Sequence, residues 1–223
     1  MPQIRTHRQW TPLAHALAAV GDQWKLLIVL AVASGPIRLS SLKEQLPGIS
    51  TGVLEHHVHQ MVELGLLSRQ RFREVPPRVE LELTDSGHEL LPIASALARW
   101  GMRRQWSAPD DREQVEADAL VRQLPALLEM ETDLPSGTVE AVLAINDDRL
   151  RHWFQIDDGR LQASDRHNGE ATGCIEGDEA AWIAALGPQL DHGKLRFGGD
   201  GRLALQIFDA LARTRLALWE STP

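Results

Sequence analysis

The period of the apolar residues changes at Gly65, and this change restricts the N-terminal half of the chain to few folds. In the stretch before it, PGISTGVLEHHVHQMVELG, Leu54 and Val58 recur at the spacing of one helix face. After Gly65, the segment LLSRQRFREVPPRVELELT alternates, and Pro76-Pro77 mark a turn inside it. The sequence therefore predicts a helix that starts at Ile49-Ser50 and leads directly into a two-stranded hairpin.

Further helices are expected on both sides of this unit. Thr11-Pro12 is typical of a helix start. The run WKLLIVLAVASG is apolar almost all round, which predicts a buried helix that ends at Gly35-Pro36. Ser40 is expected to cap a short helix, SSLKEQLP, and Thr84-Asp85 to start a final helix. Helix, helix, short helix, longer helix and hairpin is the order of a winged helix-turn-helix.

A winged helix suits DNA because a helix fits the major groove, where base edges are distinguishable, while a hairpin can reach phosphates. We expect contacts from the start and the exposed side of the longer helix, from the helix before it and from the arginines of the hairpin. These candidates are Arg38, Lys43, Ser50, Thr51, Gly52, Glu55, His56, His57, His59, Arg71, Arg73 and Arg78.

The histidines among these candidates allow three interpretations. They are solvated polar positions, or they contact bases or phosphates, since a neutral imidazole both donates and accepts hydrogen bonds. A zinc site would need a third protein ligand that the i, i+3 pair His56 and His59 does not supply. We expect contact with DNA and no bound metal.

Residues 20–101 contain, in this order, GxxW before an apolar helix, the LPGIS turn, LxxxVxxMxxxGLLxR, the segment EVPPRVELELT and LLPIASALARWG. With these landmarks the segment resembles the HxlR class of bacterial winged-helix regulators. The resemblance implies a homodimer whose terminal helices pair the protomers, with two recognition helices on half-sites about one helical turn apart. Two positions depart from the pattern. Thr11 stands where many members have a cysteine used in redox sensing, and His57 stands where a basic residue is common. Cysteine switching at that site and the family's target sequences therefore do not transfer.

Charge divides the chain into two unequal parts. Residues 1–106 hold 12 Lys+Arg against 9 Asp+Glu and residues 107–223 hold 11 against 22, so the net charges are +3 and −11 and sum to −8. We predict two domains, 1–106 for DNA binding and dimerisation and 107–223 for a different partner, since the acidic part would repel DNA. No secretory signal or membrane-spanning run is visible and Cys174 is the single cysteine, so we expect a cytoplasmic protein without membrane contact.

The second part predicts an α+β domain. EQVEADALVRQLPALLEMET is an amphipathic helix that Pro125 should bend or break. Short alternating segments follow, with Asp158-Gly159 as a hairpin turn, and then the helix DEAAWIAALG, a strand in KLRFGGDG and the closing helix LALQIFDALART. This order implies an antiparallel-rich sheet covered by helices. Residues 139–211 are similar to the sterol-carrier-protein type 2 fold through WFQIDDGRLQA, ATGCIEGDEAAWIAAL and GKLRFGGDGRLALQIFDAL.

This second resemblance implies an apolar tunnel between sheet and helices for a lipid-like or aromatic molecule. The side chains expected in its wall are the large apolar ones of the second part: Trp153, Phe154, Trp182, Leu186, Phe197, Ile207 and Phe208. Ordinary core packing is the alternative for each of them, and the alternation of a strand lets only one of Trp153 and Phe154 face the interior. No nucleophile motif, phosphate loop or complete calcium loop is visible, so no catalytic residue and no cofactor is expected.

Together these features predict a non-enzymatic, DNA-binding transcription regulator, a homodimeric repressor that binds an inverted-repeat operator. A hydrophobic or aromatic small-molecule effector in the second domain would alter its affinity for DNA. Two alternatives stay open. The second domain could be purely structural, with its own side chains filling the tunnel. The protein could also be a carrier or enzyme-accessory protein for a hydrophobic metabolite, with the winged helix used for protein contacts.

Overall fold

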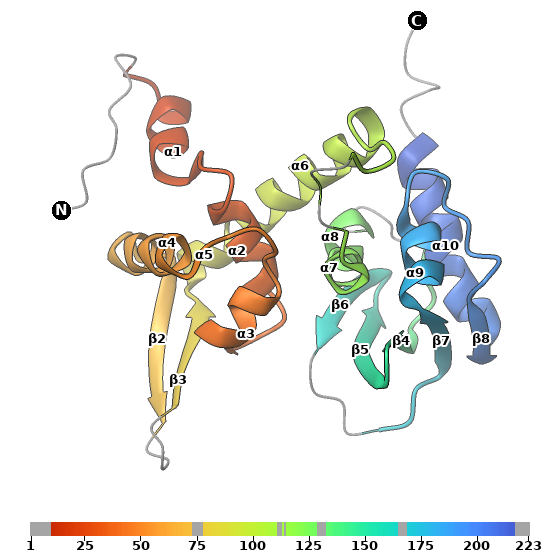
Figure 1. Cartoon of the computed structure of the whole chain (residues 1–223). Coiled ribbons are helices and arrows are strands. Elements are labelled where there is room, and N and C mark those ends of the chain that lie inside the picture. Colours follow the sequence, from red (N-terminus) through yellow and green to blue (C-terminus); the bar gives the residue numbers. More distant parts are fainter. Residues whose placement is uncertain are drawn as a thin grey trace, which may run out of the picture. The chain divides into compact units, whose positions relative to one another are not determined.

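The computed structural model divides the chain into two compact units, Met1–Ala94 and Ser95–Pro223, whose elements are labelled in Figure 1. It describes residues 10–72, 78–110, 113, 115–128, 133–164 and 169–216. The units divide twelve residues before the predicted domain boundary at 106/107, because the helix α6 (Leu91–Arg104) begins in the first unit and buries Met102 in the core of the second. The functions predicted for the two domains stay predictions.

The helices of the N-terminal unit follow one another in the predicted order. They are α1 (Pro12–Val20), α2 (Lys25–Val32), α3 (Leu39–Glu44), α4 (Thr51–Glu63) and α5 (Asp85–His88). Their apolar faces meet in one core with the base of the hairpin. The side chains at its centre, all at most 3% exposed, are Ile28, Val29, Val32, Leu42, Ile49, Leu54, Val58, Met61, Leu67 and Leu81.

Side-chain caps fix where these helices begin. The Thr11 hydroxyl accepts a hydrogen bond from the backbone N–H of Ala14 at 3.2 Å, and the Ser50 hydroxyl accepts one from Val53 at 3.3 Å. Both predicted starts are therefore confirmed. The predicted start at Ser40 is wrong: α3 begins at Leu39 with Arg38 at its N-cap position, because the chain enters this helix directly from the short strand β1 (Ile37–Arg38).

The wing is a three-stranded sheet in the order β1-β3-β2, where β2 spans Leu67–Phe72 and β3 spans Arg78–Leu83. The β2–β3 pairing is antiparallel, which confirms the predicted hairpin. Residues 73–77, including the predicted turn at Pro76-Pro77, lie outside the described residues. Near the far end of the ladder, the Arg78 guanidinium lies 4.5 Å from the centre of the Phe72 ring.

The final helix predicted for the N-terminal half is broken into two pieces. Thr84 caps the short helix α5 through the N–H of Gly87, as predicted, but α5 ends at His88 and α6 begins at Leu91. Pro92 lies at the second position of α6 and has no N–H to donate, and its ring would clash with the carbonyl group of His88, four residues earlier. The break therefore follows from one proline.

The C-terminal unit is built on a five-stranded sheet in the order β6-β5-β4-β7-β8. All neighbouring strands are antiparallel except β4 and β7, which are parallel. The predicted turn at Asp158-Gly159 is confirmed, with φ of 47° and 76° as a two-residue hairpin turn requires. The strands are β4 (Gly137–Ile145), β5 (Asp148–Asp157), β6 (Arg160–Ser164), β7 (Gly173–Asp178) and β8 (Arg196–Gly199).

Four helices pack on this sheet, and the C-terminal half of α6 contributes Met102 to the same core. They are α7 (Ala117–Arg122), α8 (Leu124–Leu128), α9 (Glu179–Leu186) and α10 (Gly201–Leu216). The predicted break at Pro125 is confirmed, since α7 ends at Arg122 and Pro125 lies at the second position of α8. A polar contact joins α7 to β5, with Asp118 Oδ1 2.7 Å from Nε2 of the buried His152. Within α7, Asp118 Oδ2 lies 2.9 Å from Arg122 Nε.

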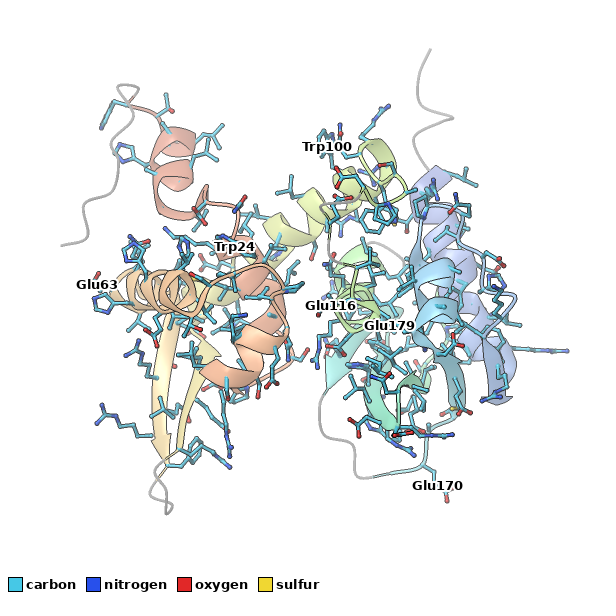
Figure 2. The ribbon with its side chains drawn as sticks, in the orientation of Figure 1. Trp24, Glu63, Trp100, Glu116, Glu170 and Glu179 are labelled. Carbon is cyan, nitrogen blue, oxygen red and sulfur yellow. The ribbon has the colours of Figure 1, made fainter. Side chains whose placement is uncertain are left out.

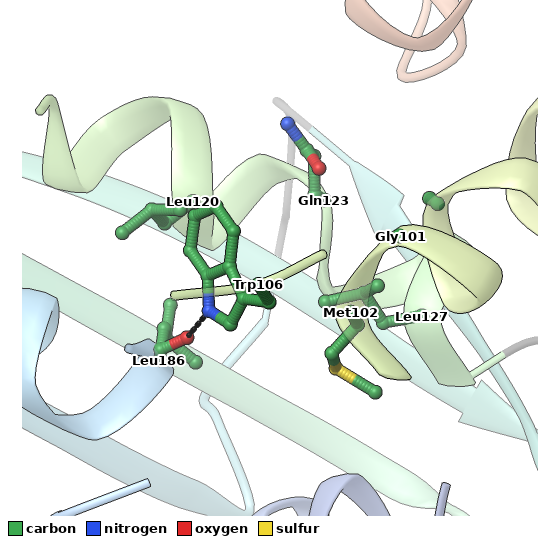
Figure 3. A pocket seen from close by; sticks show the side chains of 8 residues that line it. Gly101, Met102, Trp106, Leu120, Gln123, Leu127 and Leu186 are labelled. Atoms are coloured by element: carbon green, nitrogen blue, oxygen red, sulfur yellow. Dashed lines mark hydrogen bonds between the residues drawn. The ribbon is translucent and has the colours of Figure 1, made fainter. Parts of the chain in front are cut away.

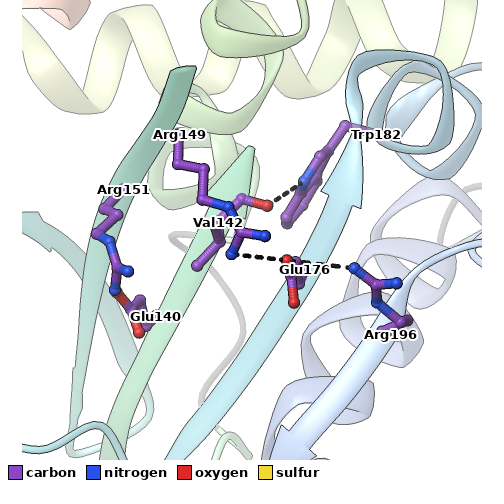
Figure 4. A network of polar contacts seen from close by, with 7 residues as sticks. All are labelled: Glu140, Val142, Arg149, Arg151, Glu176, Trp182 and Arg196. Carbon is purple, nitrogen blue, oxygen red and sulfur yellow. Dashed lines mark hydrogen bonds and ion pairs between the residues drawn. The ribbon is translucent and has the colours of Figure 1, made fainter. Parts of the chain in front are cut away.

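The two faces of the C-terminal sheet differ in character. The inner face contributes Val139, Phe154 and Ile175 to the core. The outer face carries ion pairs, shown in Figure 4: Glu176 contacts Arg149 at 3.0 Å and Arg196 at 3.2 Å, and Glu140 contacts Arg151. The apolar face under helices is the α+β arrangement that the sequence predicts, and the opposite face is polar.

Among the described residues, no single helix is long and apolar enough to cross a membrane. Only the pair of α1 and α2, which are bent by 73° relative to each other, is together long and apolar enough.

Candidate nucleic-acid interface

Helix α4 has a polar face exposed to solvent and an apolar face buried in the core. Leu54, Val58 and Met61 are at most 1% exposed, so this side of the helix is fixed against the unit. The exposed side carries a nearly continuous polar line of Thr51, Gly52, Glu55, His56, His59 and Glu63, the last of which is labelled in Figure 2. The positions Gly52, His56, His59 and Glu63, which helical spacing places on one line opposite Leu54, are therefore all exposed in the structure.

The two exposed histidines of this line have different neighbours. His59 Nε2 lies 3.6 Å from Glu63 Oε1, one turn further along the helix. The His56 ring lies 5.8 Å from the ring of His57 and is tilted against it by 59°. Imidazole and carboxylate groups on one exposed helix face can donate to and accept from base edges in a groove.

His57 is in a different environment from the one predicted for a DNA-contacting residue, because its side chain is buried. It is 8% exposed, and its Nε2 lies 3.3 Å from Asp22 Oδ1 in the turn between α1 and α2. Burial lowers the pKa of His57; Asp22 opposes this effect, and Lys25 and His56 add to it. His57 therefore faces the inside of the unit and joins α4 to the α1–α2 turn.

Two further contacts stabilise the same turn. The Lys25 ammonium donates a hydrogen bond to the carbonyl oxygen of Ala19 at 2.7 Å, and burial lowers the pKa of Lys25 although Asp22 raises it. Asp22 Oδ1 also accepts from the backbone N–H of Trp24 at 2.8 Å. The small polar cluster of Asp22, Lys25 and His57, which we call the α4 anchor, thus joins the α1–α2 turn to α4 through the contact of Asp22 with His57.

The N-terminal end of α4 leaves room for a close approach. A Cβ atom built on Gly52 would meet nothing within 4 Å, so no packing within the chain requires a glycine there. The unpaired backbone N–H groups of a helix start attract anions. The Ser50 hydroxyl uses its acceptor capacity for the cap, but its proton is still able to bond a phosphate oxygen.

The basic side chains predicted to contact DNA differ in their exposure and in their contacts within the chain. Arg38 and Arg71 are exposed, on β1 and β2, and Lys43 is half-buried on α3. Arg78 is half-buried and lies with its Nε 3.0 Å from Glu80 Oε1, so the wing fold already uses its charge. The predicted contact at Arg73 lies outside the described residues.

Strand β2 also exposes Arg69 next to Gln70 and Arg71. Arg69 was not among the predicted contacts, although its place two residues before Arg71 in an alternating strand puts both on the same side. Among the described residues, no cluster of three or more His, Cys, Asp or Glu side chains has the geometry to hold a metal ion.

The side chains predicted to line a tunnel in the C-terminal unit are mostly packed in its core. Phe154, Trp182 and Ile207 are fully buried, and Phe208 lies with its ring 6.4 Å from that of Trp182. The Trp182 indole N–H donates to the carbonyl oxygen of Val142 at 3.1 Å (Figure 4). These contacts favour the alternative of ordinary core packing for these four residues.

Of the other three predicted tunnel residues, Leu186 belongs to the same core at 7% exposure, Phe197 packs at its edge and Trp153 lies outside it. Trp153 pairs with Glu140 across β4 and β5 and therefore belongs to the outer face of the sheet, opposite to Phe154. Phe197 is half-buried, with its ring 6.0 Å from that of Phe208, and Leu186 lies at the end of α9. Of Trp153 and Phe154, only Phe154 faces the interior, as the alternation of a strand requires.

Cys174 lies on the same outer face as Trp153. Burial raises the pKa of its thiol, and the neighbouring carboxylates of Glu140 and Glu176 raise it further, against a smaller opposite effect of Arg151. A raised pKa leaves little thiolate at neutral pH, so this environment does not favour a reactive cysteine.

Comparisons with known proteins match the N-terminal part of the chain. Residues 19–109 match the family model described as HxlR-like helix-turn-helix. An HTH-type transcriptional regulator of Halalkalibacterium halodurans is 37% identical over 98 residues, which are 44% of this chain and 87% of that protein. The HTH-type transcriptional regulator YkvN of Bacillus subtilis is 37% identical over 82 residues, or 37% of this chain and 70% of YkvN.

Solved structures match the same part. The reduced form of the transcriptional regulator YodB from B. subtilis is 25% identical, with a TM-score of 0.39, over 46% of this chain and 100% of YodB. The assignment to a family rests on the sequence matches, which cover fewer than half of the residues of this chain.

Proposed function

Because the chain belongs, through residues 19–109, to the HxlR-like helix-turn-helix family, we propose that it is a transcription regulator that reads double-stranded DNA with α4. The observation that carries the proposal is that α4 buries Leu54, Val58 and Met61 in the core and exposes a nearly continuous polar line, with Val53 beside it as the one exposed apolar side chain of this described helix. A helix fixed in this way presents its polar side chains in a constant geometry, as readout of the major groove requires.

The proposed contacts fall into two groups. Thr51, Gly52, Glu55, His56 and His59 reach base edges or the phosphates beside them, and Arg38, Lys43, Ser50 and Arg71 bind the backbone, with Arg69 added to this group. His57 is omitted because it belongs to the α4 anchor. Arg78 has a lesser part because it is paired with Glu80.

The proposed active form is a homodimer that represses transcription from an inverted-repeat operator. Its support is the apolar surface of two helices. On α1, Leu13 is 68% and Leu17 50% exposed, and on α6, Ile93, Leu97 and Trp100 are about half exposed at the spacing i, i+4, i+7. Large apolar side chains in a row on a helix mark an interaction surface when they are exposed. Two copies would each supply one recognition helix to one half-site.

The C-terminal unit is proposed to be the effector-binding part, of a sterol-carrier-protein type 2-like fold. Its mixed sheet, apolar on one face and covered by helices, supports this assignment. A purely structural role is the second candidate for this unit, and the packing of Phe154, Trp182, Ile207 and Phe208 in the core favours it. A bound lipid in natively purified protein, detected by mass spectrometry, would exclude the purely structural role.

Genomic selection tests the proposed function. Sheared bacterial DNA is incubated with the purified full-length protein at near-physiological salt, and the retained fragments are sequenced. The expected result is an enriched inverted repeat with half-sites about one helical turn apart. If no motif is enriched, either with the protein alone or with added cell extract as a source of effector, the DNA-reading proposal is wrong.

A further inference from the structure

A pocket of about 210 Å³ lies within the C-terminal unit, and Figure 3 shows its lining. One wall is the C-terminal half of α6 with Trp106 just after it, and the other walls come from α7, α8 and the end of α9. Of the residues predicted to line a tunnel, only Leu186 takes part. The pocket is therefore different from the space that the sequence resemblance implies.

Small side chains on α6 keep this space open. Ala98, Gly101 and Met102 follow one another at i, i+3 and i+4 and therefore lie on one side of the helix. A Cβ atom built on Gly101 would meet nothing within 4 Å, so the absence of a side chain is not required by packing within the unit. A glycine inside a helix costs about 1 kcal/mol relative to alanine, so it is an unfavourable choice unless the space is used.

Among the described residues of the other walls, Gln123 is the one polar side chain and the rest are apolar. Leu120 and Leu127 contribute aliphatic surface. The Trp106 indole N–H donates to the carbonyl oxygen of Leu186 at 3.3 Å, so its polar atom is satisfied within the unit (Figure 3). Gln123, between α7 and α8, adds an amide that can both donate and accept.

Size and wall chemistry together limit what fits. An enclosed apolar cavity of about 150 Å³ in another protein binds benzene, so a pocket of about 210 Å³ that is partly open to solvent has room for one aromatic ring with a short substituent. Among the described residues that line the pocket none is charged, so they offer no ion-pair partner to a charged ligand group. One hydroxyl or amide group on the ligand would match Gln123.

We propose that this pocket binds a neutral, single-ring aromatic molecule that carries one hydrogen-bonding group and a short apolar substituent. This inference deepens the proposed function and rests on it. The helix α6 also carries the exposed Leu97 and Trp100, which are assigned to dimerisation. A molecule bound beside α6 is therefore assigned as the effector of the regulator. The α6 helix is the element through which occupancy reaches the dimer.

Binding is tested with para-ethylphenol as the probe and para-ethylbenzoate as a matched anionic control. Each is titrated into the full-length protein, and the Trp106 indole signal and the Gln123 side-chain amide signal are followed in proton–nitrogen correlation spectra. The Trp106 signal is identified by its loss in Trp106→Phe. The expected result is a saturable shift of both signals by para-ethylphenol and affinity at least about tenfold weaker for para-ethylbenzoate, whose carboxylate finds no partner.

Variants locate the site. Gly101→Leu should weaken binding at least about tenfold by filling the pocket, and Gly101→Ala should weaken it less. Gln123→Leu should remove the preference for para-ethylphenol over ethylbenzene. Gln206→Leu is the matched change on the exposed side of α10 and should bind like the wild type. The inference is overturned if no saturable shift occurs, or if Gly101→Leu binds the probe as the wild type does.

The operator affinity of the ligand-free protein is measured in parallel, so that the two proposals fail separately. Operator binding without a site for para-ethylphenol contradicts the pocket alone. A site for para-ethylphenol without binding to any DNA contradicts the proposed function alone. An occupied pocket that leaves operator affinity unchanged contradicts the effector role of the occupant.

Discussion

At the scale of single residues, neighbouring histidines on α4 have opposite environments. His57 follows Leu54 by three residues and precedes Met61 by four, a spacing that places it on the buried side of the helix. Histidine is polar and therefore favours the surface. Position 57 is buried nevertheless, because the helix geometry fixes the direction of each side chain once Leu54 and Met61 face the core. The spacing thus indicates the burial of His57, and the prediction that His57 contacts DNA is wrong because it follows residue type alone. The contact of His57 with Asp22 is not predictable from the sequence, since that depends on how two distant segments pack.

The α4 anchor makes folding stability dependent on pH. Burial lowers the pKa of His57 in the folded chain below its ordinary value of about 6.5. As the pH falls through that value, the unfolded chain takes up the proton first, so the free energy of unfolding decreases. We expect urea denaturation between about pH 7.5 and about pH 5.5 to show this loss, with His57→Gln removing up to about 1.4 kcal/mol per pH unit of the slope.

Asp22→Asn provides the complementary variant. The Asp22 carboxylate opposes the lowering of the His57 pKa, so its neutralisation should lower that pKa further and widen the pH range over which stability is lost. Asparagine keeps a side-chain oxygen able to accept from the Trp24 N–H, which preserves the turn. Equal pH dependence in the wild type and in His57→Gln would show that the anchor does not control stability in this range.

At the scale of helices and strands, prolines decide where two predicted helices are interrupted. Pro92 separates α5 from α6, and Pro125 separates α7 from α8. Each lies at the second position of the new helix, where its missing N–H costs no hydrogen bond. The break at Pro125 is predictable from the residue alone. The break before Pro92 is harder to predict, because a proline is also common in the first turn of a helix. The same sequence is therefore compatible with one helix that begins near Pro92 and has no helix before it.

The exposed apolar row of α6 supplies a test of assembly. We expect Leu97→Glu to weaken the dimer on the order of a hundredfold in sedimentation equilibrium, because two-fold symmetry places the new charge twice in an apolar contact. Leu205→Glu changes another exposed leucine, on α10, and should leave association unchanged. A wild-type protein that sediments as a monomer at micromolar concentration would refute the proposed dimer.

At the scale of the whole molecule, the order of elements and the division into two parts follow from the sequence. Charge separates a basic part from an acidic part, and the period change at Gly65 predicts the wing that the structure contains. The limits of the two units are less predictable, because α6 belongs to both and only tertiary packing shows where Met102 is buried.

The ligand site is the least predictable feature. Core packing and tunnel lining both select large apolar residues, so Trp182 and Phe208 are compatible with either. The pocket beside α6 depends instead on the small size of Ala98 and Gly101, which leaves space next to the helix. Small residues inside a helix are only a weak indication of a pocket in a single sequence.

The most direct test of the central claim is the salt dependence of DNA affinity, measured on the selected operator and on a scrambled duplex of equal length. The variants are His56→Ala on the exposed face of α4, Arg71→Ala on β2 and Arg202→Ala on α10 as the control. We predict that Arg71→Ala weakens both duplexes and flattens the slope of log K against log salt by about 0.9 for each lost phosphate contact. His56→Ala should keep the slope and lose about 1–3 kcal/mol of preference for the operator. Arg202→Ala should change neither. A wild-type protein that binds both duplexes equally, or His56→Ala and Arg71→Ala variants that both match the control, would contradict the claim that α4 and the wing read DNA.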